Sequence, residues 1–300
     1  MSDPVATEQT KGTSKSALRY RLHWRRRSRQ MSYFLIALVV ALMLALPLLY
    51  MFATSFKPGP EVFKTPPVFF PQRWTLDGYR ELINLSNVPV GFRNSVIVST
   101  VASTLGVLLS IGLCYVLTRF RLPGMGFFSF MTLFVYILPS ILLAIPLYQV
   151  WARLGLAGGL LPLTLTYVSI TLPFAIWMLR SYFAGIPLDL EEAALVDGAT
   201  RSQAFLAIVL PLARPGIIAT FIFTFILSWN EVLYATIFAS SMENQVVSTA
   251  LATMLQESSG WLSWGMVNAA GVAATVPVLV FFILIQRQLV TGFTAGAVKG

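Results

Sequence analysis

Charged residues are scarce in this sequence. Only 11% of its 300 residues are Asp, Glu, Lys or Arg, whereas 56% are hydrophobic. A soluble domain typically has about a quarter of its residues charged. A water-soluble core of this length has no use for so many apolar side chains, so the composition predicts a membrane protein.

Cysteine and histidine are almost absent. The one cysteine, Cys114, lies inside an apolar run, and the one histidine, His23, lies in the polar N-terminal segment. A single thiol forms no intramolecular disulfide and no zinc cluster. The sequence also lacks the phosphate-binding pattern G-x-x-x-x-G-K-[ST]. We therefore expect no catalytic residue, no metal and no cofactor on this chain, which argues against a membrane-embedded enzyme.

Long apolar runs are what the sequence has in abundance. A membrane-spanning helix needs about 20 mostly apolar residues. Six segments meet this requirement: 33–53, 95–117, 127–150, 160–179, 216–238 and 266–285. We therefore predict an all-α membrane protein with six transmembrane helices.

Positive charge gathers near the N-terminus. The formal net charge is +9, and Lys and Arg recur between Lys11 and Arg29, directly before the first apolar run. Cytoplasmic segments of membrane proteins are enriched in these residues. We expect residues 1–30 to be a basic cytoplasmic tail, residues 31–300 to be the membrane domain, and both termini to be cytoplasmic. The tail can also touch anionic membrane lipid, and we expect no nucleic-acid partner.

The Arg26-Arg27 pair also resembles the start of a signal peptide. The apolar run behind it is longer than the hydrophobic region of a signal peptide, and no convincing small-residue cleavage site accompanies it. We therefore expect an uncleaved first helix.

The polar segment 182–211 contains the most informative pattern. Asp189 and Glu192 have the spacing of a capping box, which predicts a helix that begins directly after Asp189. Acidic side chains in its first turn favour the positive end of the helix dipole. Gly198 can adopt the left-handed conformation that ends such a helix.

A second helix is expected at once. Thr200 and Gln203 form another capping-box pattern, and Pro211 stops or kinks the helix that follows. The segment is therefore predicted to be a helix, a glycine turn and a helix on the cytoplasmic face. A first helix this short is marginal in isolation, so we expect it to dock against a partner.

The residues of this segment resemble a known family. Their order and spacing are Glu192, Ala193, Ala194, Gly198, Ile208, Leu210 and Pro211. This pattern is similar to the EAA loop of the permeases of binding-protein-dependent ABC importers, in which the loop forms a coupling helix seated in a cleft of the ATPase subunit. The resemblance implies a role in ATPase coupling for Glu191, Glu192, Ala193, Ala194, Asp197, Gly198, Ile208 and Pro211. A surface helical hairpin without a partner is the alternative.

Other stretches narrow the resemblance to carbohydrate-uptake permeases. The segments 180–183 and 228–231 are similar to those of such proteins, and residues 289–300 resemble the ending of the smaller permease of the maltose-transporter type. The resemblance covers nearly all of the chain after the basic tail. It implies the type I ABC importer permease fold, with the C-terminal tail 286–300 reaching toward the ATPase dimer interface.

The resemblance also implies partners and cargo. The partners are an ABC ATPase dimer that binds ATP and Mg, a second homologous permease that makes a heterodimer, and an extracytoplasmic solute-binding protein. The implied location is the inner membrane of a prokaryote. The implied cargo is a sugar or sugar-like solute: a disaccharide, oligosaccharide, polyol or glycerol phosphodiester.

Polar residues inside the predicted spans are candidates for the substrate pathway, because such residues are costly in a membrane. Asn230 and Glu231 can bind sugar hydroxyls, and Trp229 can stack on a sugar face. Further candidates lie near the ends of other segments: Tyr148, Gln149 and Asn268. Polar groups also join helices to one another, and this alternative remains open.

A secondary transporter or channel is the alternative function. Such proteins often bury several ionisable residues as ion relays, and many contain internal repeats. This sequence has few ionisable residues within its apolar runs and no obvious two-fold repeat. A coupling loop would also have no use in a carrier that is not driven by ATP.

Overall fold

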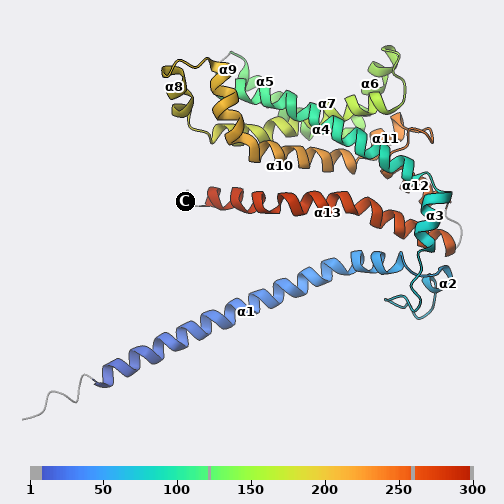
Figure 1. Cartoon of the computed structure of the whole chain (residues 1–300), viewed down its shortest axis with the longest axis horizontal. Coiled ribbons are helices and arrows are strands. Elements are labelled where there is room, and N and C mark those ends of the chain that lie inside the picture. Colours follow the sequence, from blue (N-terminus) through green and yellow to red (C-terminus); the bar gives the residue numbers. More distant parts are fainter. Residues whose placement is uncertain (1–8, 121–122, 258–260, 298–300) are drawn as a thin grey trace, which may run out of the picture. The chain divides into compact units, whose positions relative to one another are not determined.

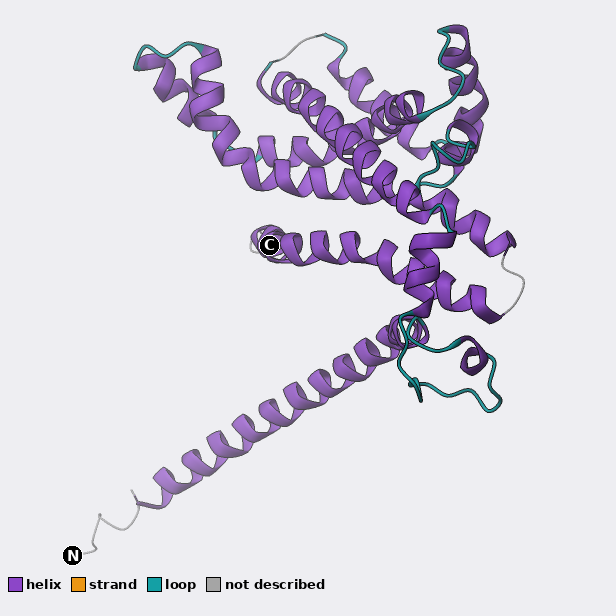
Figure 2. Ribbon diagram, turned by 45° about the vertical axis from the view of Figure 1, so that its right-hand side comes forward, coloured by secondary structure: helices purple, strands orange, loops and turns teal. Residues whose placement is uncertain are grey.

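The computed structural model describes residues 9–120, 123–257 and 261–297 (Figure 1). Within these ranges the regular elements are helices and no β-strand occurs (Figure 2). The chain divides into two units, of which the first ends at Ala53 and the second begins at Thr54. The all-helical prediction is confirmed for the part of the chain that the structure describes.

The described part of the first unit is helix α1 (Gln9–Thr54), whose last residue belongs to the second unit. Its stretch Gln30–Thr54 has a mean hydropathy of 2.7, so it is long and apolar enough to cross a membrane. The boundary predicted at residue 30 lies inside this helix. The basic segment and the first span are therefore parts of one continuous helix.

The second unit is built around three helices, α4 (Val88–Arg119), α7 (Leu160–Ala184) and α10 (Leu210–Trp229), which pack against one another. Small residues line the buried face of α4: Ser99, Ala102, Ser103 and Gly106. Membrane helices approach closely where such small residues meet, because packing rather than hydrophobicity drives their association.

Helix α13 (Trp261–Ala297) completes the second unit. It packs against α10 and against three shorter helices, which are α2 (Gly59–Val62), α3 (Asp77–Leu85) and α12 (Val247–Glu257). The predicted C-terminal tail 286–300 continues this helix as far as Ala297, and residues 298–300 lie outside the described residues.

Five helices in the described ranges are long and apolar enough to cross a membrane: Gln30–Thr54, Val88–Arg119, Leu160–Ala184, Arg201–Trp229 and Trp264–Leu284. A bent pair of helices makes a sixth if it counts as one span. The spans predicted at 33–53, 95–117, 160–179 and 266–285 match helices of the structure. The other two predicted spans differ from it.

The predicted span 127–150 is not one helix. It is divided into α5 (Met125–Ile137) and α6 (Ser140–Arg153), whose axes differ by 104°. Pro139 stands at the break and lacks the N–H needed to continue a helix. The backbone carbonyl of Ser140, the first residue of α6, accepts a hydrogen bond of 2.8 Å from the Tyr234 hydroxyl, which ties the start of α6 to α11.

The predicted span 216–238 is wrong at both ends. α9 (Arg201–Ala204), a π-helical segment (Phe205–Val209) and α10 form one continuous helical span. A stop at Pro211 does not occur, because the wider π-helical turn comes directly before this proline. At the other end α10 stops at Trp229, and the separate helix α11 (Leu233–Phe238) follows.

The short helices gather at opposite ends of the second unit. α8 (Leu188–Val196) and α9 lie at one end, whereas α3, α11 and α12 lie at the other (Figure 1). A chain that runs back and forth as long helices brings its alternate loops to the same end.

Candidate functional site

The helix–turn–helix predicted within residues 182–211 is present. α8 ends at Val196, Gly198 follows with a φ of 88°, and α9 begins at Arg201. Backbone in this left-handed region favours glycine, because a Cβ would be strained there. The predicted role of Gly198 as the terminator of the first helix is confirmed.

The two predicted capping boxes have different outcomes. The Thr200 hydroxyl accepts a 3.3 Å bond from the Gln203 N–H, and the Gln203 side chain accepts a 2.8 Å bond from the Thr200 N–H, so this box is confirmed. The box of Asp189 and Glu192 is wrong, because α8 begins one residue before Asp189 and Pro187 occupies the N-cap position. Asp189 lies in the first turn, where its charge still favours the helix dipole.

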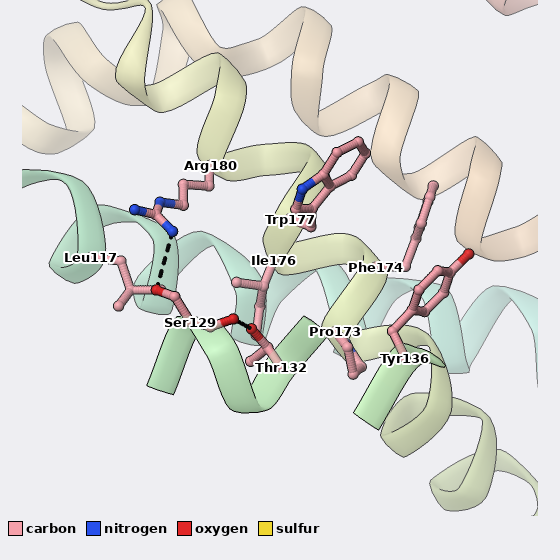
Figure 3. Close-up of a pocket in the computed structure, with 9 residues that line it drawn as sticks. All are labelled: Leu117, Ser129, Thr132, Tyr136, Pro173, Phe174, Ile176, Trp177 and Arg180. Atoms are coloured by element: carbon pink, nitrogen blue, oxygen red, sulfur yellow. Dashed lines mark hydrogen bonds between the residues drawn. The ribbon is translucent and has the colours of Figure 1, made fainter. Parts of the chain in front are cut away.

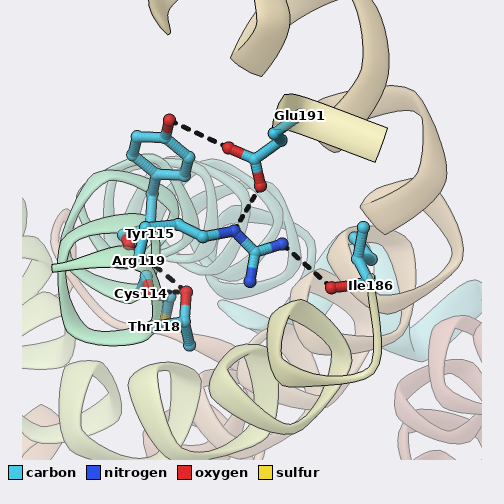
Figure 4. A network of polar contacts seen from close by, with 6 residues as sticks. All are labelled: Cys114, Tyr115, Thr118, Arg119, Ile186 and Glu191. Atoms are coloured by element: carbon cyan, nitrogen blue, oxygen red, sulfur yellow. Dashed lines mark hydrogen bonds and ion pairs between the residues drawn. The ribbon is translucent and has the colours of Figure 1, made fainter. Parts of the chain in front are cut away.

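Glu191 points into the protein and joins α8 to the end of α4 (Figure 4). Its carboxylate forms an ion pair with Arg119 and accepts a 3.1 Å hydrogen bond from the Tyr115 hydroxyl. A second guanidinium nitrogen of Arg119 donates a 3.1 Å bond to the carbonyl of Ile186, just before α8. The side chains of Arg119 and Glu191 are only 4% and 6% exposed.

The other residues of α8 and its turn form an outward surface. Its exposed members are Leu188, Leu190, Glu192, Ala193, Val196, Asp197 and Gly198, and Ala194 is half-buried. The Val196 side chain is 88% exposed, which is unusual for an apolar residue at the end of a helix. Clustered exposed apolar groups mark a surface that another protein can cover. Ile208 is half-buried and Pro211 is exposed, both beyond this surface.

A cavity of about 380 Å³ lies between α5, α6, α7 and the junction of α10 with α11. Most of its wall is apolar. Its polar groups come from Tyr136, Ser140, Ser169, Thr171, Glu231 and Tyr234. Hydroxyl and carboxylate groups on an apolar wall are the features that hold and orient a small polar molecule.

Glu231 is the acidic residue of this cavity, and the backbone around it holds it in place. Its carboxylate accepts hydrogen bonds from the backbone N–H of Tyr234 at 3.0 Å and of Ala235 at 3.2 Å, at the start of α11. The Tyr167 hydroxyl of α7 donates to the same carboxylate at 3.2 Å. The side chain therefore caps a helix and contributes to the cavity wall.

The other predicted pathway residues are not among those that line this cavity. Trp229 is buried, its indole N–H donates a 3.1 Å bond to the Ala274 carbonyl of α13, and its ring packs against Phe225. Side-chain amides of two others bond to their own helices, Asn230 to the Ile226 carbonyl and Asn268 to the Trp264 carbonyl. Tyr148 packs against Phe238, and Gln149 is exposed.

Sequence reasoning missed the polar cavity residues on α7. Ser169 and Thr171 line the cavity and are polar residues inside an apolar span, and that pattern was a usable signal for a lined cavity. Ser140 had no such signal, since its place depends on the break between α5 and α6. No group of three or more His, Cys, Asp or Glu side chains among the described residues is arranged to hold a metal ion.

A second cavity of about 200 Å³ lies between α5 and α7 (Figure 3). Its walls are mostly apolar, and the guanidinium of Arg180 donates a 3.1 Å bond to the Ser129 hydroxyl at one end. The remaining lining residues are Leu117, Thr132, Tyr136, Pro173, Phe174, Ile176 and Trp177. Tyr136 lines both cavities, so the two adjoin at the same part of α5.

Comparisons with known proteins agree with one another. The model of the family described as the binding-protein-dependent transport system inner membrane component matches residues 102–291. The inner membrane ABC transporter permease protein YcjP of Escherichia coli is 38% identical over 256 residues, which cover 85% of this chain and 91% of that protein. The diacetylchitobiose uptake system permease protein DasC of Streptomyces coelicolor is 34% identical over 264 residues, which cover 88% of this chain and 95% of that protein.

A solved structure shares the fold. A chain in the crystal structure of a bacterial ABC transporter that imports alginate matches with a TM-score of 0.75 and 20% identity, covering 87% of this chain and 96% of that one. The residues that match the family include α8 and the turn after it. They also include α7, which lines both cavities. The chain belongs to the family of binding-protein-dependent transport system inner membrane components, the permease subunits of ABC transporters.

Proposed function

We propose that this chain is the transmembrane permease subunit of an ATP-driven, binding-protein-dependent importer for a sugar or sugar-like solute. The observation that carries the proposal is the helix–turn–helix at one end of the second unit, with its exposed apolar surface, inside the region that matches the family. Uptake of a disaccharide by a system with a similar permease, DasC, supports the class of solute.

The sidedness follows from charge and topology. The basic segment before the first span favours a cytoplasmic N-terminus. Six crossings, with the bent pair α5–α6 counted as one, return the chain to the side on which it began. Both termini, α8 and α9 are then cytoplasmic, whereas α3 and α12 face the side from which a binding protein delivers solute.

The outward surface of α8 is the proposed seat of the ATPase. Glu192, Ala193, Asp197 and Gly198 are exposed there together with Val196. The small Ala193 lets a partner approach the helix closely. ATP and Mg belong to the ATPase dimer, since this chain has no phosphate-binding loop, and we propose that the chain itself catalyses no reaction.

The cavity beside α11 is the proposed part of the translocation path. Glu231, Ser169 and the tyrosine hydroxyl groups can accept and donate hydrogen bonds to sugar hydroxyls. A second, homologous permease contributes the other half of the path, and ATP-driven movement of α8 alternates the side to which the path opens. Among the residues predicted for the pathway, Glu231 is the one we retain, because it lines the cavity.

Co-purification and reconstitution test this function. The tagged chain is extracted gently from its host, and its partners are identified and reconstituted in liposomes with trapped Mg-ATP. We expect an ATPase, a second permease and a binding protein, and uptake of at least one sugar among diacetylchitobiose, maltose and trehalose only when ATP is present. Purification of the chain alone, with solute uptake in liposomes without ATP, would instead identify a secondary carrier.

A further inference from the structure

We propose that Arg119 and Glu191 form a clamp that makes α8 and α4 move as one body, so that Glu191 transmits force inside the permease instead of contacting the ATPase. The proposal rests on the proposed function, in which α8 is the element that the ATPase moves. It assigns Arg119 as a positioning residue for coupling.

The position of Arg119 is the first support. It is the last residue of α4, and its guanidinium is bonded at two places. One nitrogen pairs with Glu191 in the first turn of α8, and another donates a 3.1 Å bond to the carbonyl of Ile186, before α8 begins. Two bonds from one rigid planar group fix both the position and the direction of α8 relative to α4.

Burial distinguishes Glu191 from the other acidic residues of α8 and its turn. Glu191 is buried, whereas Asp189, Glu192 and Asp197, the other acidic residues of α8 and its turn, are exposed. A carboxylate taken out of water needs a close cation and further hydrogen-bond donors, and Arg119 with the Tyr115 hydroxyl supplies both. Movement of α8 away from α4 would have to break the ion pair and both 3.1 Å hydrogen bonds together.

Aromatic contacts tie the second arm of the helix–turn–helix to the same point. The Tyr115 ring packs against Phe205 with centroids 4.6 Å apart, and the Arg201 guanidinium lies 5.6 Å from the centroid of the Phe120 ring. Both arms of the turn therefore contact the last two turns of α4 or the residue after it. This arrangement favours movement of the whole helix–turn–helix together with α4.

The clamp leads on to the cavity. α4 packs against α7 and α10, and a buried cluster at this end joins all three helices, with Cys114, Leu179 and Ala213 among its members. Thr171 of α7 and Leu227 of α10 line the proposed translocation cavity. A displacement of α8 that carries α4 with it therefore reaches two walls of that cavity through packed helices.

The test uses the reconstituted complex with its ATPase, second permease and binding protein. Spin labels are placed at two exposed positions, Asp189→Cys on α8 and Leu108→Cys on α4, in a Cys114→Ala background. We expect the distance between the labels to remain constant when Mg-ATP is added. In Glu191→Gln and Arg119→Gln we expect that distance to change or broaden with Mg-ATP, and the stimulation of ATP hydrolysis by the binding protein to fall about fivefold or more, the lower range of typical coupling energies.

Two double variants separate coupling from folding. Arg119→Met with Glu191→Leu replaces the pair by apolar groups of similar size, which preserves folding but removes the link between the charges. Arg119→Glu with Glu191→Arg reverses the pair and is expected to restore part of the stimulation. The exposed pair Arg80–Asp77 of α3 provides the control, and Arg80→Gln is expected to change neither readout.

The outcomes are distinct. If the apolar double variant assembles normally and keeps both a constant label distance and full stimulation, the clamp is only structural and the proposal is overturned. Recovery by the reversed pair supports it. If the unsubstituted complex shows no stimulation of ATP hydrolysis by the binding protein, the failure belongs to the proposed function and not to the clamp.

Discussion

The two ends of helix α4 are held in different ways. At its beginning, neutral side chains bond directly to the backbone of the segment before α12. The Asn94 amide donates bonds of 2.9 Å and 2.8 Å to the carbonyls of Glu243 and Gln245, and the Ser95 hydroxyl accepts a 2.8 Å bond from the Val247 N–H. The side chains of Asn94 and Ser95 are buried, and each pairing leaves little freedom for the two segments to separate.

At its other end, α4 meets α8 through one buried ion pair and the hydrogen bond from Tyr115 to Glu191, and the Tyr115 ring packs against Phe205 of the π-helical segment. The adjacent surface of α8 is exposed and partly apolar. The two ends therefore differ in what they allow. The first end of α4 is held rigidly against the segment that leads into α12. At the second end, α8 is firmly attached to α4 at one point, and the rest of its surface is open to a partner.

Removal of the Asn94 amide is expected to have the largest effect. In Asn94→Leu two backbone carbonyls lose their buried donor, and each loss costs about 1–3 kcal/mol. We expect the free energy of unfolding to fall by about 2–6 kcal/mol. A thiol-reactive dye can follow unfolding in detergent, because Cys114, the one cysteine, is buried. Asn230→Leu, at an exposed amide, should change stability by no more than about 0.5 kcal/mol. An equal loss in both variants would show that the Asn94 hydrogen bonds do not hold the beginning of α4 in place.

A substitution at Gly198 changes the turn after α8 and leaves the contacts at the beginning of α4 intact. No heavy atom lies within 4 Å of the position that a Cβ would occupy, so Gly198→Val introduces backbone strain but no collision. The left-handed conformation costs other residues roughly 1–2 kcal/mol. We expect ATP-driven uptake to be lost, while dye-detected unfolding shows a loss of stability no larger than this strain. Gly112→Ala, at a helical glycine with equally open space, is the control, and normal uptake in Gly198→Val would show that the turn tolerates other shapes.

Val196 tests whether the exposed surface is a docking site. Burial of a valine side chain contributes about 1.5 kcal/mol, so Val196→Asp should weaken binding of the ATPase about tenfold. The measurement is a titration of the detergent-solubilised permease pair with the ATPase. Leu85→Asp, at a residue of α3 that is 77% exposed, should leave this affinity unchanged. Similar affinities in both variants would mean that the ATPase does not cover α8.

Substitution of Glu231, at the start of α11, is expected to give the smallest effect. In Glu231→Gln the side chain keeps its size and one acceptor oxygen, so the helix cap is only partly weakened. A neutral acceptor binds hydroxyl groups about 1 kcal/mol less favourably than a charged one. The solute concentration for half-maximal uptake should therefore rise about fivefold, with little change in unfolding temperature. If Asn230→Ala shifts uptake as much, the cavity is not the path.

Hydropathy and spacing predicted much of this fold because the helices of a membrane protein must be long and apolar to span a bilayer. The turn at Gly198 and the capping box of Thr200 were also predictable, since their causes lie within a few residues of each other. The breaks at Pro139 and Asn230 were not. A broken span has the same composition as a straight one, and proline alone does not specify a bend of 104°.

The orientation of Glu191 could not be read from the sequence either. Glu191 and Glu192 are adjacent identical residues, and which one faces inward depends on Arg119, far away in the chain. The role of Trp229 was similarly hidden, because its partner carbonyl belongs to Ala274 on α13. Contacts between distant segments decided these cases, and a single sequence does not reveal such contacts.

The π-helical segment Phe205–Val209 sets the angular phase between the docking region and the membrane span. A π-helical turn contains one more residue than an α-helical turn, and each residue of an α-helix rotates the chain by about 100°. Deletion of one residue here would allow an uninterrupted α-helix, but it would turn every downstream side chain of α10 to a new direction. This single extra residue therefore determines which face of α10 packs against α4 and α7.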